Sequence, residues 1–156
     1  MKSMRWLIGC AAAGFALACA AAETPVPGGL LKFAVGAEPP NYDCHAQSSF
    51  AFIHPVRPHY STLLKFDIAQ YPKIVGDVAE SWTISKDGLT YTFKLKKGVK
   101  FHDGTTLSSE DIKATYDRIR KPPKGVLSLR EEGYADINTI ETPDPLTVVF
   151  KLKKTN

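Results

Sequence analysis

The segment 79–120 contains two alternating runs of apolar and polar residues separated by Asp87-Gly88. The first run is Trp82-Thr83-Ile84, and the second extends over 90–96. An Asp-Gly pair between two such runs favours a tight turn, because glycine adopts positive φ without steric cost. The pattern therefore predicts an antiparallel β-hairpin. One hydrophobic cluster is expected under it, formed by Trp82, Tyr91, Phe93 and Leu95.

An amphipathic helix is predicted directly after the hairpin. Ser108 and Asp111 have the spacing of a capping box, in which each residue bonds to the other's backbone amide. Pro122-Pro123 ends the helix, because proline cannot continue it. Its apolar stripe at i, i+4 and i+7 is formed by Ile112, Tyr116 and Ile119.

Three further strands are predicted. Ala135–Glu141 and Thr147–Leu152 are joined at Pro143-Asp144-Pro145, and Leu30–Val35 is expected to be a first strand buried on both faces. The stretch 36–58 between that strand and the rest is predicted to be a long irregular loop. The fold class is thus α/β to α+β, a mixed sheet with antiparallel hairpins and a capped helix.

Residues 1–22 have the composition of a secretory signal peptide. Lys2 and Arg5 precede an apolar run too short for a comfortable membrane span, and an A-x-A cleavage site follows Ala20 or Ala22. Lipid attachment at Cys19 is the alternative, because the four residues before it form a loose lipobox. Export to the periplasm is expected in either case.

Composition limits the remaining possibilities. The 156 residues amount to one domain, here 23–156. The chain has 20 basic and 16 acidic residues, and excluding Lys2 and Arg5 leaves 18 against 16, which is no footprint for nucleic acid. With Cys10 and Cys19 in the signal, Cys44 has no internal disulfide partner. Cys44 is then either a buried small side chain or a thiol whose partner lies elsewhere.

No catalytic or cofactor motif emerges from the sequence, so the chain is not expected to be an enzyme or to hold a cofactor. Ser48-Ser49 lacks the G-x-S-x-G context of a hydrolase nucleophile. The histidines have no metal-ligand spacing along a helix, yet those that lie in or beside the loop can converge in space. A metal site of this kind is a lesser alternative and would use His45, His54 and His59.

A longer match supports a specific family. A-E-S-W at 79–82 is followed by S-K-D-G-L-T-Y-T-F-K-L-K-K-G-V-K-F-H-D-G-T at 85–105 and by L-S-S-E-D-I at 107–112. This run resembles the signature region of periplasmic solute-binding proteins of peptide-type and nickel-type ABC transporters, the family 5 extracellular solute-binding proteins. The resemblance extends from about Leu30 to the end of the chain.

The resemblance implies a two-lobed fold that closes over a solute. Residues 23–156 would form the N-terminal part of the first lobe, with the second lobe missing. The implied function is binding of a di- or oligopeptide and its delivery to the permease and ATPase subunits of an ABC transporter, without nucleic acid. Two alternatives remain: a nickel- or metallophore-binding protein of the same fold, and a truncated, non-functional fragment.

The resemblance also places the ligand site in the loop Asp43–Arg57. The positions that match ligand contacts of peptide-binding members are Ser48, Phe50 and Arg57, with Ser49 between the first two. Serine hydroxyls and backbone groups can pair with a peptide, Phe50 can form an apolar wall, and Arg57 can bind a carboxylate. The simpler alternative is that Phe50 is a core residue and that Arg57 contacts only solvent or a neighbouring acidic residue.

Overall fold

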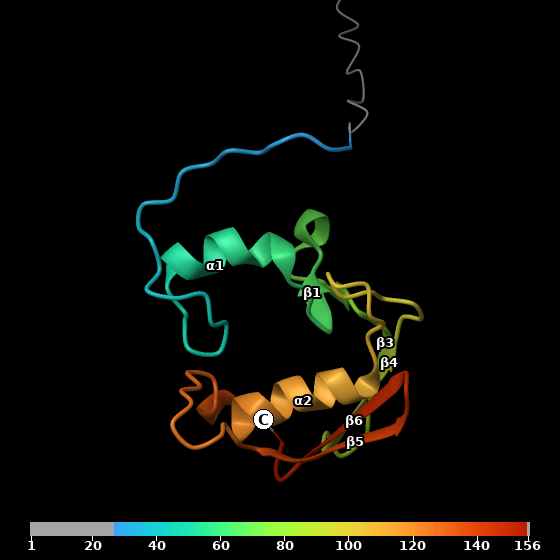
Figure 1. Cartoon of the computed structure of the whole chain (residues 1–156). Helices are drawn as coiled ribbons and strands as arrows, with labels where there is room; N and C mark the ends of the chain where they lie inside the picture. The colour runs from blue at the N-terminus through green and yellow to red at the C-terminus, as the bar shows by residue number, and fades with distance from the viewer. Residues whose placement is uncertain (1–26, 156) are drawn as a thin grey trace, which may run out of the picture. The chain divides into compact units, whose positions relative to one another are not determined.

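The computed structural model describes residues 27–155, so the predicted signal peptide and Cys19 lie outside the described residues (Figure 1). The chain divides after Phe33, and residues 27–33 carry no helix or strand. The elements of the second unit, in order, are α1 Phe50–Val56, η1 Arg57–His59, β1 Leu64–Phe66, η2 Ile68–Gln70, β2 Ile74–Gly76, β3 Ala79–Ile84, β4 Thr90–Leu95, α2 Ser109–Arg120, η3 Glu132–Tyr134, β5 Ile137–Asp144 and β6 Thr147–Leu152.

The predicted hairpin is confirmed as β3 and β4. The two strands pair antiparallel with Trp82 opposite Phe93, and Gly88 closes the turn at a φ of 70°. The Gly88 amide donates to the Ser85 carbonyl at 2.9 Å, and the Asp87 carboxylate accepts from the Leu89 amide at 3.0 Å. Local turn chemistry therefore sets the register that places the apolar face of β4 toward the core.

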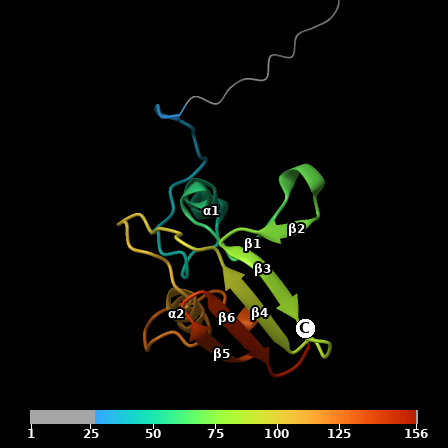
Figure 2. The same cartoon turned by 90° about the vertical axis from the view of Figure 1, so that its right-hand side faces the viewer.

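The second predicted hairpin is confirmed as β5 and β6, and it joins the first in a four-stranded sheet. The strand order is β3-β4-β6-β5, and every neighbouring pair in this sheet is antiparallel (Figure 2). In β6, Val148 and Phe150 are buried and Leu152 is half-buried, as their alternation predicted. A separate two-stranded sheet pairs β1 with β2.

The predicted capped helix is α2. The Asp111 carboxylate accepts from the Ser108 amide and from the Ser108 hydroxyl, each at 2.8 Å. The helix contacts β5 and β6 and buries Ile112 and Ile119. Ile112 belongs to one hydrophobic cluster with residues of the sheet, so the sheet and α2 share one core. Its other buried hydrophobic members are Leu63, Val78, Ala79, Phe93, Leu95, Ile137, Ile140, Val148 and Phe150.

Two predictions from the sequence are wrong for the segment before β1. No strand forms over Leu30–Val35, where Leu30 and Leu31 are 81% and 84% exposed. An apolar run becomes a buried strand only beside a partner strand, and none of the described strands pairs with it. The predicted irregular loop 36–58 contains the helix α1, which includes Pro55. The density of prolines and aromatic residues concealed this short helix.

The described chain is thus an α+β arrangement of antiparallel hairpins with one well-capped helix, as predicted. Among the residues that the structure describes, no helix is long and apolar enough to cross a membrane.

Candidate ligand-binding site

The helix α1 displays one exposed face and one buried side chain. Phe50, His54 and Arg57 follow each other at i, i+4 and i+7 and therefore lie along one face, and all three are exposed. The rings of Phe50 and His54 are 5.2 Å apart, and Phe50 is 76% exposed. On the other side, Phe52 is 2% exposed, with the ring of Tyr42 6.4 Å away. We call Phe50, His54 and Arg57 the α1 face.

The predicted site residues are distributed along this helix. Ser49 is the N-cap of α1, Phe50 opens its first turn and Arg57 follows its last residue. Phe50 is therefore an exposed residue of the α1 face, and the alternative that it is a core residue is wrong. The Ser49 carbonyl accepts from the amides of Phe52 and Ile53 at 3.1 and 2.9 Å, so it is not free to pair with a peptide strand. Ser48, exposed and outside the helix, retains that capacity.

The α1 face offers an apolar contact and a charged contact to a solute. Seven residues along a helix separate Phe50 from Arg57 by roughly 10 Å. An aromatic ring at one end and a guanidinium at the other can hold a solute with an apolar group and a carboxylate at that spacing. Sequence reasoning had assigned His54 only to a metal, whereas the helical period places it between the two.

A cavity of about 550 Å³ lies between the segment 59–63 and α2, and we call it the α2 cavity. Leu63, Ile112 and Ile119 contribute to its apolar lining, and His45 and His59 line it as well. Ser48, Ser49, Phe50 and Arg57 do not line it. Sequence reasoning missed this cavity because its walls come from segments between 44 and 134 that only the fold brings together.

The metal alternative with His45, His54 and His59 does not agree with the structure. His54 packs against Phe50, whereas His45 and His59 line the α2 cavity. Within residues 27–155, no group of three or more histidine, cysteine, aspartate or glutamate side chains is placed to hold a metal ion. Burial lowers the pKa of His45, and the nearby Arg118 guanidinium lowers it further.

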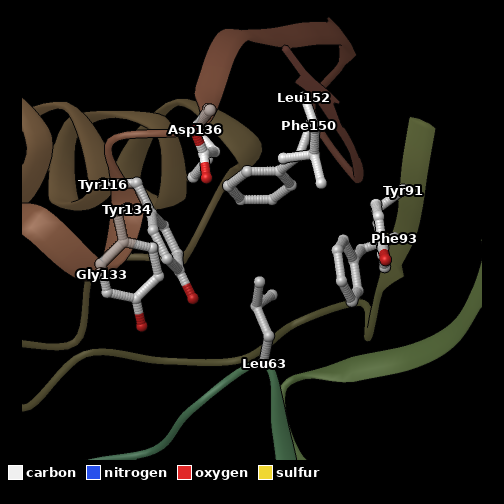
Figure 3. Close-up of a pocket in the computed structure, with 10 residues that line it drawn as sticks. Leu63, Tyr91, Phe93, Tyr116, Gly133, Tyr134, Asp136, Phe150 and Leu152 are labelled. Carbon is white, nitrogen blue, oxygen red and sulfur yellow. The ribbon is translucent and has the colours of Figure 1, made fainter. Parts of the chain in front are cut away.

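A second, smaller hollow of about 260 Å³ opens beside the sheet, and we call it the aromatic pocket (Figure 3). Phe150 and Leu63 face each other across it, with Tyr116 on one side and Phe93 on the other. Phe150 meets Phe93 and Tyr116 edge-on, with ring centroids 5.6 and 4.9 Å apart. Leu63, Tyr116 and Tyr134 also line the α2 cavity, so the two hollows share these three residues. Such a surface can accept an apolar group.

The phenol of Tyr116 makes stability depend on alkaline pH. Burial, with a smaller contribution from the neighbouring Tyr134, raises its pKa to about 12, above the value of about 10 for an exposed tyrosine. Because the folded state holds this proton more tightly, the contribution is fully present below pH 10 and is lost as pH rises toward 12.

We expect the free energy of unfolding to fall by about 2 kcal/mol from this group between pH 10 and pH 12. Urea denaturation of the wild type and Tyr116→Phe at pH 9, 10, 11 and 12 measures it. The variant cannot ionise at this position, so the difference between the two proteins should change by that amount. Parallel pH curves for the two proteins would contradict the buried, protonated phenol.

Comparison with known proteins indicates one protein family. Residues 73–156 match the profile of the bacterial extracellular solute-binding proteins, family 5, middle region. A putative ABC transporter peptide-binding protein of Brucella ovis is 49% identical over 81 residues, which cover 52% of this chain and 15% of that protein. The chain therefore spans only a small part of the relative that it matches.

Two solved structures share the fold. The oligopeptide-binding protein AppA of Bacillus subtilis, in complex with a nonapeptide, has a TM-score of 0.66 and 32% identity, covering 74% of this chain and 22% of AppA. NikZ of Campylobacter jejuni, in complex with Ni(L-His), has a TM-score of 0.57 and 33% identity, covering 62% of this chain and 19% of NikZ.

Proposed function

The chain belongs to the family 5 bacterial extracellular solute-binding proteins, and from this we propose that it helps capture a di- or oligopeptide in the periplasm for an ABC importer. The observation that carries the proposal is the 49% identity to a relative named as a peptide-binding protein. The permease and ATPase subunits of the importer are the proposed partners. Binding and release are non-covalent, so no catalytic group is required.

We assign peptide contact to the α1 face and to the two serines before it. Phe50 is 76% exposed although it is a large apolar side chain, and a solute can cover it. Arg57 can donate two parallel hydrogen bonds to a terminal or side-chain carboxylate. Ser48 and the Ser49 hydroxyl add polar contacts, since the Ser49 side chain makes no cap hydrogen bond to α1.

The similarity to NikZ, which was solved with Ni(L-His), supports the nickel alternative. The described residues contain no preformed three-ligand metal cluster. A nickel complex would therefore be held through the groups of its amino acid, and the α1 face offers the same contacts to such a ligand as to a peptide.

Calorimetric titration of the chain with trialanine, with a mixed-sequence nonapeptide and with Ni(L-His) tests the proposal. Saturable 1:1 binding of either peptide, with a Kd of roughly micromolar or tighter, is the expected result. Saturation by Ni(L-His) without peptide binding would replace the proposal with the nickel alternative. No binding of any of the three would favour the alternative of a truncated, non-functional fragment.

A further inference from the structure

The turn that precedes α1 is tied to arginines far along the chain. One guanidinium nitrogen of Arg130 donates to the Cys44 carbonyl, and the other donates to the Gln47 carbonyl at 3.1 Å. Arg130 lies 86 residues after Cys44 and 83 residues after Gln47 in the sequence. A planar guanidinium can reach two carbonyls at once, so this single side chain fixes both ends of the turn.

Two more contacts join the same turn to the same region. Arg118 of α2 pairs with the Asp43 carboxylate at 3.2 Å, and the Leu129 amide donates to the His45 carbonyl at 2.9 Å. The other oxygen of Asp43 accepts from the His45 amide at 2.8 Å, so Asp43 shapes the turn and docks it. We call the turn 43–47 with Arg118 and Arg130 the α1 latch.

The latch matters because α1 has little other attachment. Phe52 is the single buried residue within α1. A seven-residue helix is unstable alone, so its position depends on contacts made outside it. The hydrogen bonds of the latch lie immediately before the helix and fix the direction in which the chain enters it.

We infer that Arg130 and Arg118 are positioning residues for solute binding, which hold the turn 43–47 and thereby fix where the α1 face is presented. The role in binding rests on the proposed function, whereas the ordering of the turn does not. Arg130 donates to two backbone carbonyls from two different nitrogens, so this contact requires the forked guanidinium. Lysine keeps the positive charge but carries all its donors on one nitrogen, whereas Arg130 reaches the two carbonyls from two nitrogens, so lysine cannot reproduce both bonds in this geometry.

Arg120 provides a matched control elsewhere in the fold. One nitrogen of its guanidinium donates to the carbonyls of Ile137 and Asn138, both at 3.0 Å, beside β5. Arg120→Gln removes this contact, together with the ion pair that Arg120 makes with Asp117 of α2, and touches neither the turn nor α1. This control shows whether a change over 44–57 comes from losing the latch or from losing any arginine that bonds to backbone carbonyls.

Hydrogen exchange of the free chain tests the positioning role. We expect amides over 44–57 to exchange about tenfold faster in Arg130→Lys, because charge-assisted hydrogen bonds to backbone carbonyls are lost. In Arg118→Gln the increase should be only about twofold to fivefold, because its ion pair with Asp43 is more than a third exposed to solvent. Arg120→Gln should accelerate exchange in β5 and near Asp117 of α2, and leave exchange over 44–57 unchanged. The urea midpoint of the sheet core should stay unchanged in the latch variants, because no residue of 43–57 belongs to the core cluster.

The consequence for binding is measured by calorimetry with the same nonapeptide and trialanine. Apparent affinity falls in proportion to the fraction of molecules in which the turn is closed. We expect Arg130→Lys to open the turn in most free molecules and thereby to weaken peptide binding about tenfold, with Phe50 and Arg57 intact. Unchanged exchange over 44–57, or faster exchange with unchanged affinity, would overturn the inference. Absence of peptide binding by the wild type would instead reject the proposed function.

Discussion

Replacing Phe93 with alanine should lower the free energy of unfolding by about 3–5 kcal/mol. Phe93 is 8% exposed and packs edge-on against Phe150 with ring centroids 5.6 Å apart. In the sheet it lies opposite Trp82 on β3 and opposite Val148 on β6, so its ring is surrounded from both neighbouring strands. Removing the ring enlarges the aromatic pocket, and the exposed walls lose their contacts.

Urea denaturation followed by tryptophan emission measures this loss, since Trp82 lies opposite Phe93 in the sheet. Ser108→Ala is the matched control, because it removes a hydroxyl that hydrogen-bonds to Asp111 at the start of α2 without changing the core. Loss of a helix cap costs about 1 kcal/mol. Losses of equal size at the two positions would show that the face of β4 bearing Phe93 is not the buried one.

The local signals of the sequence were sufficient for most of the sheet and for α2. Asp87-Gly88 and the alternation around it predicted β3 and β4, because the turn and the side-chain period are both set by neighbouring residues. Ser108 and Asp111 predicted the start of α2 for the same reason. Each of these features has its cause within a few residues of sequence.

The errors came where the outcome depends on distant residues. Whether Leu30–Val35 becomes a strand depends on a partner, and its sequence cannot supply one. The helix α1 depends on the burial of Phe52 and on the α1 latch, which Arg118 and Arg130 complete from 75 and 86 residues away.

The candidate site also has features that the sequence could predict and features that it could not. Ser48, Ser49, Phe50 and Arg57 were named from a family resemblance, and the helical period then explains why Phe50 and Arg57 share a face with His54. The α2 cavity and the aromatic pocket have no sequence signature, because their walls come from separated segments. A sequence motif can identify single residues, whereas a cavity lined by distant segments can be identified only from the folded structure.

The assignment of Arg57 gives the second large expected effect. Arg57→Ala should weaken binding of the nonapeptide by about 2–5 kcal/mol, because the carboxylate of the solute would be left without its partner. Arg57 is exposed and follows the last residue of α1, so its removal disturbs no buried contact of the fold. Calorimetry on the wild type and the variant measures the difference, and the urea midpoint shows that folding is unaffected.

Arg57→Lys distinguishes the kind of contact. A carboxylate held by two parallel hydrogen bonds needs the guanidinium fork, whereas a carboxylate attracted only by charge is satisfied by an ammonium group. If lysine restores most of the affinity lost in Arg57→Ala, the contact is a simple charge attraction. If lysine fails to restore it, the contact is bidentate, and Arg57 selects solutes that present a carboxylate roughly 10 Å from an apolar group over Phe50. Unchanged affinity in both variants would place Arg57 outside the site and leave the α1 face without its charged contact.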